Sequence, residues 1–322
     1  MESPIYREIL SIFYPFYYVF TLFSQLLVIY TILRHSPKNL QTLKKILINT
    51  CLFQIIHATT CFLTQMRQVS NLTPMQLWVY GPARHFDPMI AYSIYHMLQT
   101  AAFVSSMSVF ITIYMKYEAA KNITTPKGKI IKVVVLLCIP ILVSVGMEVT
   151  SIISQAQSAE KQAMLRTLNS NITEHSVVGI IDLNYLPSRI NLVLISAPVI
   201  LLPAAGLWLR RKILRYLAAG TDRNSQQRSN QNQNFVNGLT LQAFMPLIFY
   251  LTIFIPFFYV IFTREEILAQ QFIIFALPVL PTGVDPFITL YSVTPYRRQI
   301  KIWLRIDKTN TITTVTSSQI VT

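Results

Sequence analysis

The chain has 322 residues, of which 52% are hydrophobic and only 12% are charged. A soluble domain usually carries about twice that share of charged residues, and it needs polar side chains to cover its surface. The composition therefore argues against a soluble enzyme or binding domain. The formal net charge is +14, which makes nucleic acid and an anionic membrane surface the two partners to weigh.

Seven apolar segments are long enough to cross a membrane. A hydrocarbon core of about 30 Å needs about 20 apolar helical residues, and lipid offers no partner for free backbone groups, so each segment is expected to be a helix. The segments are residues 9–33, 46–66, 88–115, 133–153, 190–209, 238–263 and 267–294. The fourth is the weakest because Glu148 interrupts it. We predict an all-α membrane protein with one seven-helix transmembrane domain over residues 1–308.

The basic residues indicate which way the segments point. All 27 Lys and Arg residues lie outside the seven spans, seven of them on the N-terminal side and twenty on the opposite side. Positive charge is retained in the cytoplasm, so the N-terminus is predicted outside and the C-terminus inside. Membrane topology thus accounts for the basic balance, with lipid headgroups as partners and no role for nucleic acid.

Two Asn-X-Thr sequons fall in segments predicted to lie outside. Asn171 is a candidate glycosylation site in the second outer loop, and Asn71 is a weaker one because Pro74 follows its sequon.

The segment that follows the seventh span combines apolar and basic residues. Ile300, Trp303 and Leu304 form one apolar face surrounded by cations, a pattern typical of a short helix lying in the membrane interface. Residues 309–322 are rich in Ser and Thr and are predicted to be a disordered tail.

No catalytic, metal or cofactor motif is present. The chain lacks HExxH and GxSxG motifs and a phosphate-binding glycine loop, and it has only eight glycines. Its three cysteines lie inside apolar segments, without the grouping of a disulfide framework or a zinc site. We therefore expect neither an enzyme nor a bound cofactor.

The third span carries a polar stripe. Tyr92, His96, Gln99, Phe103 and Ser106 follow spacings of three and four and so share one helical face. Such a stripe should face the interior of the bundle, either as a ligand pocket or as hydrogen bonds that only join helices.

Two acids lie within the spans, where a carboxylate costs about 3 kcal/mol at the bilayer centre. Glu148 could form a wall of a pocket or reach the headgroup region. Asp285 precedes Pro286, which frees a backbone carbonyl and bends the helix. This pair is either a two-state switch or a satisfied structural carboxylate.

Four stretches resemble a known family when taken in order. They are SPKNLQTLKKILINT (Ser36–Thr50), YGPARHFDP (Tyr80–Pro88), LTLQAFMPL (Leu239–Leu247) and DPFITLYSVTPYRRQI (Asp285–Ile300). With seven spans and an outer N-terminus, the chain resembles the nematode serpentine chemoreceptors, which are G-protein-coupled receptor-like, and most closely their class delta.

Three positions depart from the patterns of such receptors. Ala83 follows Gly81-Pro82, and no outer loop contains a cysteine, so the disulfide that many such receptors form there is impossible. Lys116 lies where the large rhodopsin-like class carries an acid-Arg-Tyr triplet, and Thr289 holds the tyrosine position of the motif in span seven.

The resemblance implies a chemosensory receptor in the plasma membrane, in the cilia of a sensory neuron. A small odorant or pheromone would bind in the outer half of the bundle, and a heterotrimeric G protein would bind inside. The implied pocket residues are Tyr92, His96, Gln99, Glu148 and Tyr259; the switch residues are Asp285, Pro286 and Pro246; the G-protein contacts are Lys116, Arg210, Arg211, Lys212, Arg297 and Arg298.

Two other classes of function stay open at this point. A seven-helix ligand-gated cation channel of the odorant-receptor kind has the opposite topology, which the charge bias opposes. A small-solute transporter would show an internal repeat, and none is visible in the sequence.

Overall fold

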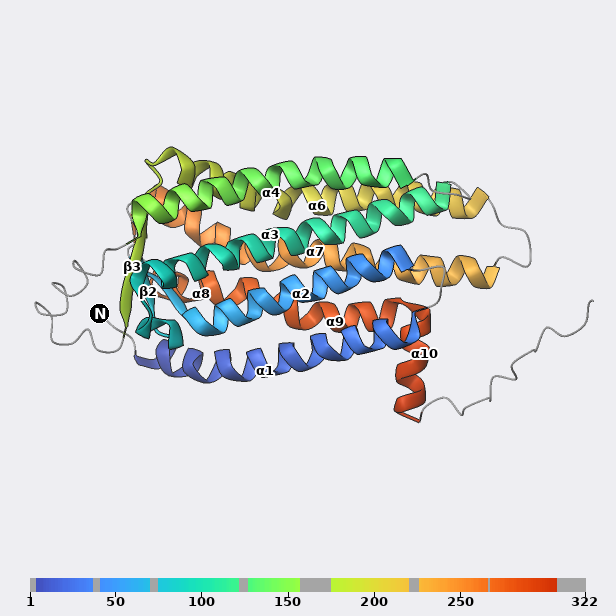
Figure 1. The fold of residues 1–322 in the computed structure, drawn as a ribbon, viewed down its shortest axis with the longest axis horizontal. Coiled ribbons are helices and arrows are strands. Elements are labelled where there is room, and N and C mark those ends of the chain that lie inside the picture. The colour runs from blue at the N-terminus through green and yellow to red at the C-terminus, as the bar shows by residue number, and fades with distance from the viewer. Residues whose placement is uncertain are drawn as a thin grey trace, which may run out of the picture.

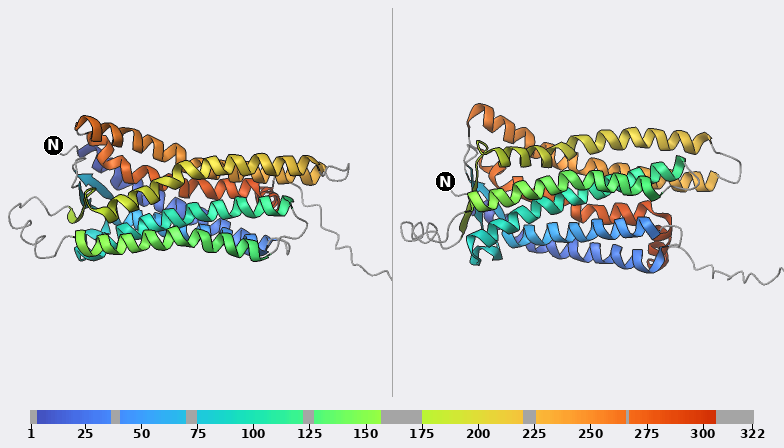
Figure 2. Two further views of the ribbon diagram at one scale, coloured as in Figure 1. Left: turned by 90° about the horizontal axis from the view of Figure 1, so that it is seen from above. Right: turned by 45° about the horizontal axis from the view of Figure 1, so that its top comes forward.

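The protein forms a bundle of long helices. The computed structural model describes residues 4–36, 41–69, 75–121, 127–156, 175–219, 226–265 and 267–305. The main helices are α1 (Pro4–His35), α2 (Gln41–Thr64), α3 (Pro88–Lys121), α4 (Lys127–Gln155), α6 (Leu186–Ala219), α7 (Gln226–Thr263), α8 (Leu268–Ala276) and α9 (Leu280–Ser292). Within the described residues, seven helical segments are long and apolar enough to cross a membrane, with α8 and α9 together making the last. Each overlaps a predicted span, and all lie side by side in Figures 1 and 2.

Several helices extend beyond the apolar segments that predicted them. α3 continues to Lys121 and α6 to Ala219, and α7 already begins at Gln226. Their polar ends project at the end of the bundle farthest from the N-terminus (Figure 1). The backbone hydrogen bonds of a helix form within the helix and do not require apolar side chains. Hydropathy therefore predicts the membrane-crossing part of a helix but not its full length.

The last span is broken. A 3₁₀ turn at Leu277–Val279 separates α8 from α9. Pro278 lies within this turn and Pro281 is the second residue of α9, and each lacks the N–H that a continuous helix would use. The helix is thus interrupted before Pro286, the proline at which the sequence predicted a bend, and Pro286 itself lies inside α9.

A small sheet corrects the all-α prediction. The strands β1 (Met66–Val69), β2 (Met75–Val79) and β3 (Ser176–Ile181) form an antiparallel sheet in the order β1-β2-β3. It lies across the end of the bundle near the N-terminus (Figure 1). The second predicted span ran to Met66, but α2 ends at Thr64, and Gln65 adopts a left-handed φ of 42° that turns the chain into β1. The fold is thus mostly helical rather than entirely so.

The distribution of apolar side chains is that of a membrane protein. Val28, Ile113 and Leu209 belong to a buried cluster between the helices. Large apolar side chains such as Phe16 and Phe262 are at the same time exposed on the outer surface of the bundle. Exposed apolar surface of this extent is unfavourable in water, and lipid would cover it.

The short helix α10 (Thr294–Trp303) follows α9 directly. It runs across the end of the bundle rather than along it (Figure 1). Tyr296 is buried, and its hydroxyl lies 2.6 Å from that of Ser36, beyond the end of α1. Trp303 packs against the rings of Tyr30 and His35. These contacts hold α10 against α1, and its predicted place in the membrane interface stays a prediction.

Candidate functional site

A cavity of about 150 Å³ lies beneath the sheet. Its walls come from α3, α4, α6, α7 and α8, and the three strands contribute Gln68, Met75 and Ile181. Most of its lining is aromatic or aliphatic, including Phe254, Phe257 and Phe275. Among the described residues that line it, none is Lys, Arg, Asp or Glu. An apolar enclosure with a few polar groups is the usual form of a small-molecule site.

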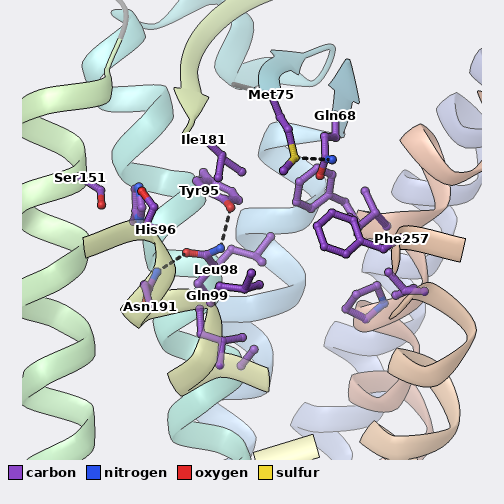
Figure 3. A pocket seen from close by; sticks show the side chains of 18 of the residues that line it. Gln68, Met75, Tyr95, His96, Leu98, Gln99, Ser151, Ile181, Asn191 and Phe257 are labelled. Atoms are coloured by element: carbon purple, nitrogen blue, oxygen red, sulfur yellow. Dashed lines mark hydrogen bonds between the residues drawn. The ribbon is translucent and has the colours of Figure 1, made fainter. Parts of the chain in front are cut away.

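His96 on α3 is a polar group of this cavity without a hydrogen-bond partner. It is 4% exposed, and Tyr92 and Tyr95 hold its ring edge-on, with centroid distances of 4.7 and 4.9 Å. Neither of its ring nitrogens has a hydrogen-bond partner within the described part of the chain. Ser151 on α4 also lines the cavity, and its Oγ is likewise unpartnered there (Figure 3).

Gln99 has a different role, because both ends of its amide are hydrogen-bonded. It donates through Nε2 to the hydroxyl of Tyr95 at 2.6 Å and accepts through Oε1 from Asn191 Nδ2 at 3.1 Å (Figure 3). Asn191 in turn accepts from Ser144 Oγ at 2.9 Å. This chain joins α3, α6 and α4 and fixes the shape of the cavity.

Glu148 lies behind the cavity wall rather than in it. It is 3% exposed and accepts hydrogen bonds from Thr100 and from Ser144, the latter at 3.4 Å. The interpretation that it reaches the headgroup region is therefore wrong. It is absent from the cavity lining and supports the wall through Ser144 and Asn191.

The two predicted pocket tyrosines have different places. Tyr92 lines the cavity and donates to the carbonyl of Ile180 at 2.8 Å, which ties α3 to β3. Tyr259 is 48% exposed on α7 and donates to Glu265 at 3.1 Å. Because α7 turns this side chain away from the cavity, the assignment of Tyr259 to the pocket is corrected.

Asp285 lies in a buried polar cluster farther along the bundle. It accepts from Gln54 Nε2, and Gln54 accepts from Gln25 at 2.7 Å, so the cluster joins α9, α2 and α1. Oδ2 of the carboxylate thus has a donor, whereas the buried Oδ1 has no partner among the described residues. The role of Asp285 as a switch stays a prediction. Of the other two switch residues, Pro286 lies within α9 and Pro246 within α7, where the side chain is not among those described.

The predicted G-protein contacts lie at the end of the bundle opposite the sheet (Figure 1). Arg210 donates to Asn237 at 3.2 Å and so joins α6 to α7, while Lys212 Nζ lies 3.8 Å from the ring centroid of Trp208. Arg211 and Arg298 are exposed. Arg297 lies over Tyr291 on α9. Four predicted features lie outside the described residues or side chains: the side chain of Lys116, Asn71, Asn171 and the tail 309–322.

Sequence reasoning missed several residues that build these sites. Ser151, Asn191 and Gln54 are polar residues inside apolar spans, and such residues usually face the bundle interior. The sequence therefore contained a signal for all three residues. It did not show which residues they would contact, because contacts between helices depend on how each helix is rotated about its axis.

Comparison with known proteins connects this geometry to a family. The sequence model of the family "serpentine type 7TM GPCR chemoreceptor Srd" matches residues 10–302 of this chain. Serpentine receptor class delta-47 of Caenorhabditis elegans is 42% identical over 313 residues, which cover 97% of this chain and 99% of that protein. Serpentine receptor class delta-40 of the same organism is 42% identical over 317 residues, covering 98% and 99%. The chain therefore belongs to the Srd family of serpentine seven-transmembrane GPCR chemoreceptors.

Proposed function

We propose that this protein is a chemosensory G-protein-coupled receptor of the plasma membrane of a sensory cell. A small odorant or pheromone binds in the cavity beneath the sheet, and a heterotrimeric G protein binds at the opposite end. The observation that carries the proposal is a largely apolar cavity, with unpartnered polar atoms among its described lining residues, in a chain of a chemoreceptor family. The excess of cations at the far end supports a cytoplasmic location for that end.

A second, smaller cavity links the ligand cavity to the Asp285 cluster. It measures about 40 Å³ and is lined by His57, Gln54 and Asp285. It shares Tyr250 and Pro278 with the ligand cavity. A ligand that moves either residue therefore also changes the surroundings of Asp285. If the ligand binds one of two arrangements of the helices more tightly, it shifts the protein toward that arrangement. The position of α7 and α9 then changes at the end of the bundle far from the ligand cavity.

In this proposal, basic side chains of α6 and α10 contact the G protein. Arg211 and Arg298 are exposed there, and Lys212 and Arg297 lie over aromatic rings. Arg210 on α6 and Lys116 near the end of α3 complete the proposed set. An exposed cationic surface attracts an acidic partner and speeds its association.

The proposal is tested by measuring nucleotide exchange on a heterotrimeric G protein in membranes that contain the receptor. We expect an odorant to stimulate exchange, and Arg211→Ala with Arg298→Ala to reduce it at least about tenfold without changing surface level. Lys132→Ala is the control, because it removes an exposed cation from α4 instead.

Equal exchange in the double variant and the wild type would contradict the proposed contact surface. A ligand-evoked current in membranes that lack G protein would contradict the receptor proposal and favour the channel.

A further inference from the structure

Two side chains of the ligand cavity have hydrogen-bonding atoms that nothing described in the protein satisfies. They are Nδ1 and Nε2 of His96 and Oγ of Ser151. His96 is 4% exposed and Ser151 2%, so bulk water does not compensate them. Buried polar groups almost always have a partner. Both residues line the same cavity, one from α3 and one from α4 (Figure 3).

The neighbouring polar side chains have partners within the wall. Gln99 is bonded to Tyr95 and Asn191, and Tyr92 is bonded to the carbonyl of Ile180. Gln155 Oε1 accepts from Ser188 at 3.1 Å. Among the described lining residues, His96 and Ser151 are those with fully buried side-chain polar atoms that have no partner.

The charge of the lining restricts what can bind there. Among the described lining residues, an ammonium group would find no carboxylate, and a carboxylate would find no Lys or Arg. Burial of an unpaired charge is strongly unfavourable. The described lining therefore favours an uncharged occupant.

The size of the cavity restricts the occupant further. An engineered apolar cavity of about 150 Å³ in another protein takes up a molecule of the size of benzene. The cavity of this receptor has a similar volume of about 150 Å³. It therefore suits a molecule on the order of six to ten non-hydrogen atoms.

We propose that the ligand is a small, uncharged, largely apolar alcohol whose hydroxyl group bonds to His96 and Ser151. A neutral imidazole has one donor and one acceptor, and a serine hydroxyl can do both. A ligand hydroxyl can donate to one and accept from the other. A carbonyl group only accepts, so it could not donate a hydrogen bond to either residue. The inference rests on the proposed function in taking this cavity as the ligand site.

The test measures thermal unfolding of the full chain, purified in lipid nanodiscs, with matched compounds. The aromatic set is benzyl alcohol, toluene, benzoate and benzylamine, and the linear set is 1-hexanol, hexane, hexanoate and hexylamine. A ligand that binds only the folded state raises the unfolding temperature in proportion to its affinity. We expect the alcohol of at least one set to raise it most, the hydrocarbon less, and the ions not at all.

Two variants locate the hydroxyl group. His96→Phe keeps a ring of similar size, and Ser151→Ala removes only the hydroxyl. Each should weaken binding of the alcohol by about tenfold while leaving the unliganded protein at least as stable, because an unpaired buried group is lost. Ser154→Ala is the matched control, since Ser154 lies on the same helix but is exposed and bonded to the carbonyl of Thr150.

Three results would overturn the inference. They are preferential stabilisation by an ion, no stabilisation by either alcohol, and an alcohol effect that His96→Phe leaves unchanged. A purely structural role of His96 would instead lower the stability of the unliganded variant.

The two proposals fail separately, because this binding assay contains no G protein. A chain that binds alcohols and activates no G protein contradicts only the proposed function. Activation of a G protein by a charged odorant contradicts only the ligand class.

Discussion

At the scale of single residues, the two acids inside the bundle each accept a hydrogen bond from a side chain on another helix. Asp285 could be identified from the sequence as a buried acid, but its partner Gln54 could not. Gln54 is one of several amides in apolar spans, and only the rotation of α2 brings it to α9. Glu148 shows the same limit, since Thr100 and Ser144 satisfy it inside the bundle.

Replacing the donor of Asp285 should be costly. Gln54→Leu keeps the volume but leaves the carboxylate without the donor seen in the structure. We expect a loss of stability of about 1–3 kcal/mol, the penalty of an unsatisfied buried group, measured by denaturation in nanodiscs. The double change Gln54→Leu with Asp285→Leu should recover part of this loss, since both partners are then apolar. A single variant as stable as the wild type would show that the pair has no structural role.

At the scale of elements, hydropathy located the seven spans but not the sheet. A span of some 20 apolar residues is a strong signal, whereas strands of four to six residues carry little. Burial does alternate along β2, with Met75, Leu77 and Val79 buried, so a hairpin with β1 could have been inferred. The pairing of β2 with β3 joins segments about a hundred residues apart along the chain. No local sequence pattern predicts such a pairing.

The sheet covers the ligand cavity without any disulfide, and Gly179 allows its close approach to α3. A Cβ at this position would lie 2.5 Å from Tyr92 Cε2. Gly179→Ala should therefore push β3 from Tyr92, lower the unfolding temperature and speed the dissociation of the ligand. The measurements are thermal unfolding and ligand washout.

Gly146→Ala is the matched control in α4, where an added Cβ would meet nothing within 4 Å. It should be neutral or stabilising by about 0.5–1 kcal/mol, because alanine favours a helix. Equal behaviour of the two variants would show that the contact between β3 and α3 does not hold the sheet in place.

At the scale of the whole molecule, the bundle has two unlike ends, and signalling would require both. The sheet and the ligand cavity lie at one end, and the cations of α6 and α10 at the other (Figure 1). The polar stripe of α3 predicted its rotation correctly, since Tyr92, His96 and Gln99 all line the cavity. Tyr259 was misplaced because α7 is apolar on nearly all sides in this part, so no stripe fixes its rotation.

The most direct test of this two-ended account is the accessibility of epitope tags at Met1 and Thr322. Cells that express the tagged protein are stained intact and then after permeabilisation. We expect the N-terminal tag to be stained on intact cells and the C-terminal tag only after permeabilisation, because the ligand cavity then lies outside and the basic end in the cytoplasm. A C-terminal tag stained on intact cells, with the N-terminal tag hidden, would contradict it.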